Sequence, residues 1–327
     1  MTVKSKLLEL LEQHKGETLS GQAIATELAC TRAAVWKAVK SLREEGYTIE
    51  AGPNKGYMLA KETNRLSVEG IRPFLAKPEA VVKLFKEVDS TNQAAKKLAV
   101  SGEAGHGAFV IAQRQTAGRG RRGRTFISPE DAGLYLSVIL EPSETLKESL
   151  LLTTAAATAV YKAVKKVCGI SLDIKWVNDL YNQGKKVCGI LTEAITDFEG
   201  GTIETAIVGI GINLYHEPGS FPEEIKAVVG ALYGDKAEAE RIDRNLLAAE
   251  IVNLLLEETR ELKLSKEYVE HNIVPGHKIQ IIDGERSRFA KAISICPDGR
   301  LLVEEKDGSE TRLSFGEVSV AIERHGG

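Results

Sequence analysis

Apolar residues recur at helical spacing in three short stretches at the N-terminal end of the chain. The apolar positions are Val3, Leu7, Leu10 and Leu11, then Ala23, Ile24 and Leu28, then Val35, Val39 and Leu42. Ser20 precedes the second stretch and Thr31 the third, and both residue types are favoured at a helix N-cap. Gly46 then supplies a C-terminal stop. The pattern predicts three short helices.

Two further runs, 47–50 and 56–59, flank a turn-rich segment and predict a small hairpin with Lys55 at its tip. Three helices followed by a hairpin are typical of a winged helix-turn-helix, whose third helix enters the major groove of DNA. The residues that we expect to contact DNA are Thr31, Arg32, Trp36, Lys37, Lys40 and Lys55. A compact helical module for protein contacts is the alternative, because exposed basic residues are often only a solvated helix face.

The remainder of the chain shows two different patterns. From residue 66 to residue 272, β-branched runs alternate with helical stretches and predict a mixed α/β domain with strands at 81–88, 109–112, 134–140, 172–176, 187–194 and 203–212. After Pro275, short strands at 278–282, 290–296, 301–305 and 310–315 are separated by glycine turns, as in a small β-barrel. We therefore expect a multidomain α+β protein with domains at 1–65, 66–272 and 273–327.

Composition narrows the functional classes. The chain has 327 residues, of which 43% are hydrophobic and 27% charged, and a formal net charge of −3. Any DNA binding must therefore come from a local basic patch. The absence of a signal-like N-terminus and of a long apolar run predicts a cytoplasmic protein with no membrane contact. The cysteines Cys30, Cys168, Cys188 and Cys296 lie far apart and predict neither disulfides nor a structural metal site.

The segment 113–125 holds five arginines and three glycines with no acid among them. It satisfies a G-x-G-x-x-G pattern and would match a P-loop if Arg124 were lysine. Both motifs must open a helix, whereas the following segment has an extended pattern and ends at Pro129, so we reject a Rossmann or P-loop fold. We expect a flexible loop whose guanidinium groups chelate a carboxylate or phosphate and which orders on binding. A disordered basic loop or a nonspecific nucleic-acid tail is the alternative.

A second polar cluster lies between two predicted strands. Asn178 and Asp179 follow one strand, and Lys185 and Lys186 begin the next, close to Gly189. A lysine beside a glycine can bring its ammonium group close to a ligand carboxylate. Lysines at strand ends are usually only solvated, and an Asn-Asp pair can equally form a turn.

Five motifs occur in a fixed order along the chain: Asp-Ser-Thr-Asn-Gln at 89–93, Gly-Arg-Gly-Arg-Arg-Gly-Arg at 118–124, Lys-Trp-Val-Asn-Asp at 175–179, Lys-x-x-Gly-Ile-Leu at 186–191 and Gly-Ile-Gly-Ile-Asn at 209–213. Together they resemble the biotin–protein ligase family. The two flanking modules extend this resemblance over nearly the whole chain, to the bifunctional ligase/biotin-operon repressors of bacteria. The resemblance implies a class II synthetase-like central domain and an SH3-like C-terminal barrel.

The resemblance also implies a reaction. Such a ligase uses ATP with Mg to convert biotin into biotinyl-5'-AMP and transfers biotin to a lysine of a biotin carboxyl carrier protein. The adenylate serves as corepressor, and the adenylate-bound homodimer binds operator DNA. The magnesium is expected to travel with the nucleotide, so no protein residue is assigned as a metal ligand.

The family's functional residues map onto this sequence as follows. Biotin binding is expected from Ser90, Thr91, Asn92, Gln113, Arg119, Gly120, Arg121, Lys186 and Gly189. Nucleotide binding is expected from Arg119, Arg121, Arg122, Asn178, Lys186 and Asn213, and the catalytic role from Lys186, Arg121 and Asp179.

The chain departs from the family pattern at two positions, with Phe126 where many relatives have tryptophan and Val177 where proline is common. Phe126 keeps a hydrophobic wall but lacks the indole donor. Two alternatives remain open, namely a lipoate-type ligase or acyl transferase, and a ligand-sensing repressor without turnover.

Overall fold

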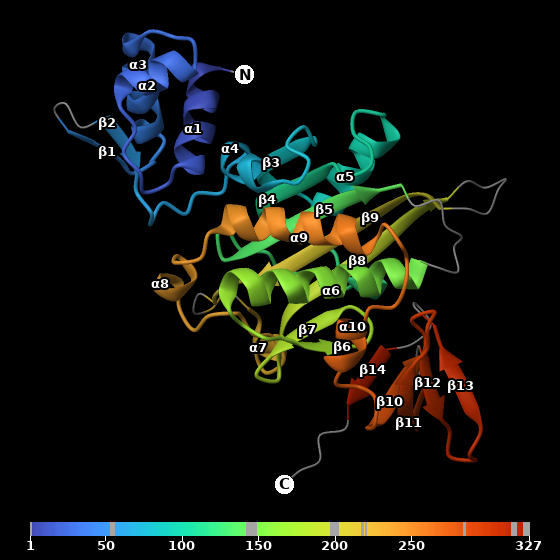
Figure 1. Ribbon diagram of the computed structural model, residues 1–327. Helices are drawn as coiled ribbons and strands as arrows, with labels where there is room; N and C mark the ends of the chain where they lie inside the picture. The colour runs from blue at the N-terminus through green and yellow to red at the C-terminus, as the bar shows by residue number, and fades with distance from the viewer. Residues whose placement is uncertain are drawn as a thin grey trace. The chain divides into compact units, whose positions relative to one another are not determined.

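The computed structural model describes residues 2–52, 56–141, 149–196, 203–216, 219, 221–283, 286–314 and 319–322 (Figure 1). The chain forms two compact units, one of residues 1–79 with 240–250 and one of residues 80–239 with 251–327. The three domains expected from the sequence stay a proposal, since the two units divide the chain at other positions.

The first unit contains the expected helices and hairpin: α1 (Val3–Gln13), α2 (Gly21–Glu27), α3 (Arg32–Glu44), β1 (Ile49–Gly52) and β2 (Gly56–Leu59). Both expected N-caps are confirmed, because the side chain of Ser20 accepts a hydrogen bond from Ala23 N at 3.0 Å and that of Thr31 accepts one from Ala34 N at 3.2 Å. The apolar positions form one core, which includes Leu7, Leu11, Ile24, Val35, Val39, Leu42 and Leu59. Lys55 lies outside the described residues.

The segment that follows the hairpin is hydrogen bonded to the start of α9 (Arg244–Glu258) within the same unit. Asn245 is fully buried; its Nδ2 donates to Arg65 O at 2.9 Å, and its Oδ1 accepts from Ser67 N at 3.0 Å. Arg244 N donates to Asn64 Oδ1 at 3.1 Å. Ser67 in turn caps the short helix α4 (Val68–Ile71), which continues into η1 (Arg72–Phe74). The segment is therefore held by specific hydrogen bonds.

The second unit is built on a seven-stranded mixed sheet with the order β3-β4-β5-β9-β8-β7-β6. The strands are β3 (Val82–Val88), β4 (Phe109–Gln115), β5 (Gly133–Leu140), β6 (Asp173–Lys175), β7 (Asp179–Asn182), β8 (Lys185–Thr196) and β9 (Ile203–Asn213). Only β3 and β4 pair in parallel. All six expected strands are present, and β7 is an additional strand where the sequence left a polar cluster or turn.

Helices cover both faces of this sheet. α5 (Thr91–Val100) packs Ala94 and Ala95 against Val110, Ile139 and Ile207 on one face. α6 (Ser149–Cys168) lies on the other, where Thr153 Oγ1 is 2.8 Å from Thr192 Oγ1. The remaining helices are α7 (Glu223–Lys226), α8 (Lys236–Ala239), the end of α9 and α10 (Lys266–Glu270). Helices therefore pack against both faces of the sheet. The face that α5 covers carries the site described below.

The C-terminal strands form a separate antiparallel sheet with the order β13-β12-β11-β10-β14. They are β10 (Lys278–Asp283), β11 (Arg286–Ile295), β12 (Leu301–Glu304), β13 (Glu310–Leu313) and β14 (Ser319–Ile322). Gly299 and Gly308, at φ values of 82°, occupy two of the expected turns.

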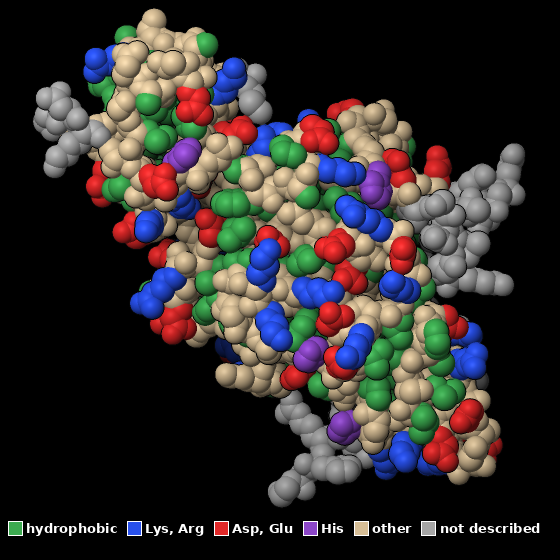
Figure 2. Space-filling model, in the orientation of Figure 1, with side chains coloured by type: hydrophobic (Ala, Val, Ile, Leu, Met, Phe, Trp, Pro, Cys, Tyr) green, Lys and Arg blue, Asp and Glu red, His purple; other side chains and the backbone are tan. Residues whose placement is uncertain are grey.

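Basic and acidic side chains are interspersed over the face seen in Figure 2, in keeping with the small net charge. Of the helices that the structure describes, none is both long and apolar enough to cross a membrane.

The first unit contains one buried acid. Glu12, at the end of α1, is 2% exposed, and its Oε2 lies 3.3 Å from Lys15 Nζ. The same ammonium group lies 3.3 Å from Asp243 Oδ2. Burial raises the pKa of Glu12 above its usual value and outweighs the opposing attraction of Lys15.

This raised pKa predicts a measurable pH dependence. The folded chain holds the Glu12 proton to a higher pH than the unfolded chain does, so the contribution of Glu12 is largest below the ordinary carboxyl pKa and falls as pH rises through the raised value. In Glu12→Gln this fall should disappear. Denaturant unfolding between about pH 4 and pH 8 measures it, and identical pH dependence in the two proteins would contradict the assignment.

Candidate active site

A cavity of about 190 Å³ opens on the α5 face of the seven-stranded sheet. Its walls come from the start of α5, the end of β4, the segment 119–126, and strands β7, β8 and β9. The lining residues are Ser90, Thr91, Asn92, Gln115, Arg119, Gly120, Arg121, Arg122, Arg124, Thr125, Phe126, Lys175, Trp176, Asn178, Asp179, Lys186, Gly189, Ile190, Leu191, Gly209, Ile210 and Gly211.

Glycines form the floor of the cavity. Gly209 and Gly211 occupy the same side of β9, and Gly189 lies opposite Gly211 on β8. A Cβ atom on Gly209 would lie 2.0 Å from Asn92 Oδ1, and one on Gly211 would lie 2.5 Å from the ring of Phe126. The missing side chains therefore leave room for α5 and Phe126 to approach the sheet and for a flat ligand to lie between them.

Small polar side chains line the α5 end of the cavity. Ser137 Oγ, fully buried on β5, lies 2.7 Å from Thr91 Oγ1 and 2.6 Å from Asn92 Oδ1. Thr91 donates to Gln115 Oε1 from its backbone N at 2.9 Å and from its hydroxyl at 3.1 Å. Gln115 Nε2 then donates to Ser128 Oγ at 2.8 Å. This network fixes the donors and acceptors that a polar ring system would meet.

Residues 118–125, here called the arginine loop, are held by two backbone hydrogen bonds. Gly120 N donates to Arg124 O at 2.7 Å, and Phe126 N donates to Gly118 O at 2.9 Å. The loop's only helical turn is η2 (Arg121–Gly123), in which Arg122 has a φ of 56°. Residues 109–140 are all described and contain no α-helix, so the glycines at 118–123 form neither a Rossmann motif nor a P-loop. Whether the loop orders on binding an anion stays a prediction.

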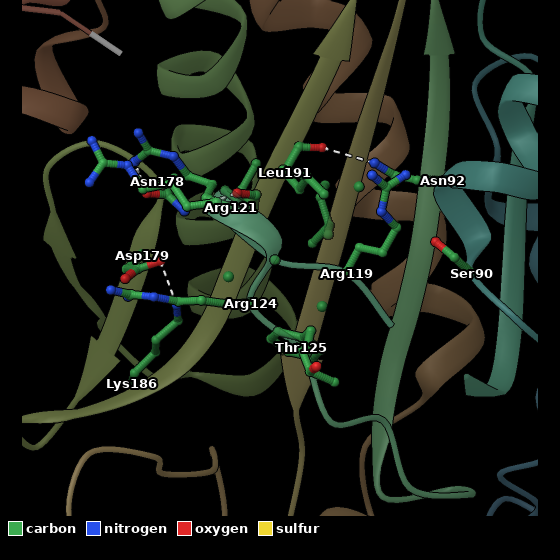
Figure 3. Close-up of a pocket in the computed structure, with 18 of the residues that line it drawn as sticks. Ser90, Asn92, Arg119, Arg121, Arg124, Thr125, Asn178, Asp179, Lys186 and Leu191 are labelled. Atoms are coloured by element: carbon green, nitrogen blue, oxygen red, sulfur yellow. Dashed lines mark hydrogen bonds and ion pairs between the residues drawn. The ribbon is translucent and has the colours of Figure 1, made fainter. Parts of the chain in front are cut away.

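Charged groups gather at the opposite end of the cavity (Figure 3). Lys186 Nζ lies 2.6 Å from Asp179 Oδ1, and Arg121 Nη1 donates to Asn178 Oδ1 at 2.9 Å. Burial lowers the pKa of Arg121, although a guanidinium keeps its proton at any working pH. Two cations beside a glycine floor can neutralise a carboxylate and a phosphate brought together, while Asp179 can accept a hydrogen bond from an amine.

Contacts behind the cavity hold its wall in place. Trp176 Nε1 donates to Gly299 O at 2.8 Å, in the turn before β12. The buried hydroxyl of Tyr268 donates to Val177 O at 2.9 Å, and Arg122 Nη1 donates to Ile282 O at 3.4 Å. The C-terminal strands therefore support two residues of the lining.

The structure brings together most of the residues expected at the site. Those that line the cavity are Ser90, Thr91, Asn92, Arg119, Gly120, Arg121, Arg122, Asn178, Asp179, Lys186 and Gly189. Gln113 does not line it, and Gln115 stands there in its place. Gln115 Oε1 accepts a hydrogen bond from Thr91 N at the start of α5, and this contact holds its side chain in the cavity wall.

Asn213 also lies outside the lining, because its amide Nδ2 donates to Gly230 O at 3.0 Å and fastens the chain beyond β9. Further lining residues were given no site role from the sequence. Gln115 and Thr125 lie outside the five motifs, whereas the others lie within them: Arg124, Lys175, Trp176, Ile190, Leu191, Gly209, Ile210 and Gly211. Glycines two residues apart at 209 and 211 were the available signal for the floor. Within the described ranges, no group of three or more His, Cys, Asp or Glu side chains could hold a metal ion.

Five of the residues expected to contact DNA are described, and they lie together in the first unit. Thr31, Arg32, Trp36, Lys37 and Lys40 are all exposed along one side of α3, and the Trp36 side chain is 60% exposed. Lys40 Nζ lies 5.9 Å from the centre of the Trp36 ring, a cation–π contact. The buried face of the same helix carries Val35, Val39 and Leu42.

Comparison with known proteins gives two family matches. Residues 84–213 match the biotin/lipoate A/B protein ligase family, and residues 3–58 match an HTH domain. The chain is 37% identical to the bifunctional ligase/repressor BirA of Bacillus subtilis, with 94% of this chain and 95% of that protein covered. It is 31% identical to the bifunctional ligase/repressor BirA of Escherichia coli over 98% of this chain and 97% of that protein.

Among solved structures, the chain is similar to the biotin protein ligase of Aquifex aeolicus in complex with biotin and ATP. The TM-score is 0.59 at 30% identity, and the match covers 74% of this chain and 99% of that one.

Proposed function

The chain belongs to the family of bifunctional ligase/repressor proteins, and on that premise we propose that it activates biotin with ATP, transfers it to a lysine of a biotin carboxyl carrier protein, and represses transcription. The observation that carries the ligase function is the cavity itself. The cavity has a polar end at the start of α5 and a cationic end at Arg121 and Lys186. Both ends lie over the same glycines of β8 and β9. The similar Aquifex aeolicus ligase is named for its complex with biotin and ATP.

The α5 end of the cavity suits the ring system of biotin. Ser90 and Thr91 are at most 3% exposed, and with Gln115 they offer donors and acceptors that a ureido ring can use. Phe126 and the glycines offer apolar surface on either side. In this proposal Gln115 takes the role expected of Gln113, and Gly120, Gly189 and Asn92 shape the slot.

The cationic end suits the reacting groups. A biotin carboxylate oxygen attacks the α-phosphorus of ATP, the bond to the β-phosphate oxygen breaks, and pyrophosphate leaves. Lys186 and Arg121 stabilise the negative charge that spreads over the phosphoryl oxygens, and Asn178 holds the Arg121 guanidinium in position. Arg122 and Arg124 add positive charge at the nucleotide side.

The second step forms the amide bond. The carrier lysine amine attacks the carbonyl carbon of the mixed anhydride, the bond to the phosphate oxygen breaks, and AMP leaves with the electron pair. Asp179, 2.6 Å from Lys186, is placed to orient the incoming amine and to receive its proton. The arginine loop covers the adenylate and keeps water from hydrolysing it. Magnesium accompanies ATP, whose phosphate oxygens are ligands that this ion prefers.

The repressor function rests on the first unit. The exposed face of α3, with Arg32, Trp36, Lys37 and Lys40, would enter the major groove, and Lys55 would contact the backbone. One such helix makes too few phosphate contacts for tight specific binding at physiological salt, so operator binding requires a homodimer. The edge strand β3 is the candidate for pairing two sheets, because the outer side of β6 is hydrogen bonded to the segment 271–273.

The proposal has further features. A class II synthetase-like central domain, an SH3-like arrangement of β10 to β14 and biotinyl-5'-AMP as corepressor are proposed from the family resemblance. A cytoplasmic location and domain boundaries near residues 65 and 272 are proposed from the sequence pattern.

Replacement of the cavity lysine tests the ligase mechanism. Lys186→Ala should slow biotin-dependent exchange of pyrophosphate into ATP by about a hundredfold to a thousandfold, because it removes a preorganised cation from the transition state. Lys185→Ala, an exposed neighbour on the same strand, is the matched control. Near wild-type exchange in a folded Lys186→Ala protein would rule out the role.

The corepressor proposal predicts that biotin with ATP increases both the dimer fraction and operator affinity. Whatever binds the dimer better also favours DNA occupancy, and such couplings are typically about 1–3 kcal/mol. Sedimentation and operator gel shifts with and without ligand measure both quantities. A dimer fraction and an operator affinity that do not change with ligand would refute the corepressor role. The proposed ligase function would be unaffected by that result.

A further inference from the structure

Glu193 lies beside the cavity but does not join its lining. It follows Gly189 and Leu191 at alternate positions of β8, so its side chain points to the same face of the sheet. Its Oε2 accepts a hydrogen bond from Asn92 Nδ2 at 2.7 Å, and its Oε1 lies 3.2 Å from Arg119 Nη1. One carboxylate therefore bridges helix α5 and the arginine loop.

The α5 side of this bridge is rigid. Asn92 is 4% exposed, its Oδ1 lies 2.6 Å from the buried Ser137 hydroxyl, and its Nδ2 also donates to Leu191 O at 3.3 Å. The loop side is more open, since the Arg119 side chain is 48% exposed and that of Glu193 is 26% exposed. A fixed amide thus orients a carboxylate, which in turn orients a loop arginine.

Arg119 and Arg121 of the arginine loop are directed to opposite sides of the cavity (Figure 3). Arg119 is directed to Glu193 and Asn92, whereas Arg121 hydrogen bonds to Asn178 near Lys186. A guanidinium already paired with a carboxylate contributes less net charge to an incoming phosphate than one bonded to a neutral amide.

We propose that Glu193 is a positioning residue that fastens the arginine loop to α5 through Arg119. This pairing commits Arg119 to closing the loop over the biotin end and leaves phosphate charge to Arg121 and Lys186. The names of the two ends rest on the proposed function, whereas the ion pair and its effect on the loop do not.

The first test uses the full chain without substrates. Glu193→Gln keeps an oxygen for Asn92 but loses the charge that attracts Arg119, so amide hydrogen exchange in the loop at 118–125 should accelerate about twofold to fivefold. Glu87→Gln is the matched control, because it breaks another Glu–Arg pair of the same sheet, 2.9 Å from Arg114. Loop exchange unchanged in Glu193→Gln, or equally faster in Glu87→Gln, would overturn the proposal.

The second test adds biotin and ATP. Glu193→Gln and Arg119→Gln should each speed release of bound biotin by about fivefold and change the KM for ATP by less than about twofold. The double variant should be no worse than either single one, because both remove the same pair. Additive effects, or a KM for ATP that rises as much as biotin release, would show that Arg119 acts on phosphate. Failure of the wild-type protein to bind biotin would instead refute the proposed function and leave the exchange result standing.

Discussion

The site depends on keeping several arginines close together at the edge of a partly buried slot. Neighbouring positive charges repel each other strongly where water is excluded. The protein offsets this repulsion because three of the four guanidinium groups that line the cavity contact different acceptors: Glu193 for Arg119, Asn178 for Arg121 and a backbone carbonyl of β10 for Arg122. The loop between them is closed by its own backbone hydrogen bonds. The positive charge that these contacts do not neutralise favours an anionic ligand. The same residues can therefore bind a carboxylate and stabilise a phosphoryl group, and the loop that carries them can exclude water.

The glycine floor is the second half of this arrangement. Only strands without side chains at 189, 209 and 211 allow α5 and Phe126 to approach the sheet from two directions. The polar network through Thr91, Ser137 and Gln115 then fixes the ends of both the helix and the loop. Phe126 provides the hydrophobic wall that the sequence predicted for it, and its ring centre lies 6.4 Å from that of Tyr135 in an edge-to-face contact.

Much of this could be predicted from the sequence, and the failures have physical causes. The N-terminal helices followed from apolar spacing and from Ser20 and Thr31, since capping is a local interaction. Strand β7 was missed because its four residues are mostly polar and pair only through the neighbouring strands. Gln113 was assigned from the family resemblance, and the residue that bonds the start of α5 is Gln115, a contact that depends on the packing of α5 and not on any local pattern. Asn213 belongs to a matched motif, yet its amide is used by a backbone carbonyl that no local pattern reveals.

We propose that one cavity both activates biotin and passes it to a protein lysine. The most direct measurement is incubation of the full chain with labelled biotin, ATP and the carrier domain of a biotin-dependent carboxylase, followed by mass spectrometry of the carrier and quantification of AMP and pyrophosphate. We expect label on a single carrier lysine through an amide bond, with one AMP and one pyrophosphate released for each biotin transferred. Binding of biotin without any transfer, or transfer of lipoate in preference to biotin, would contradict it.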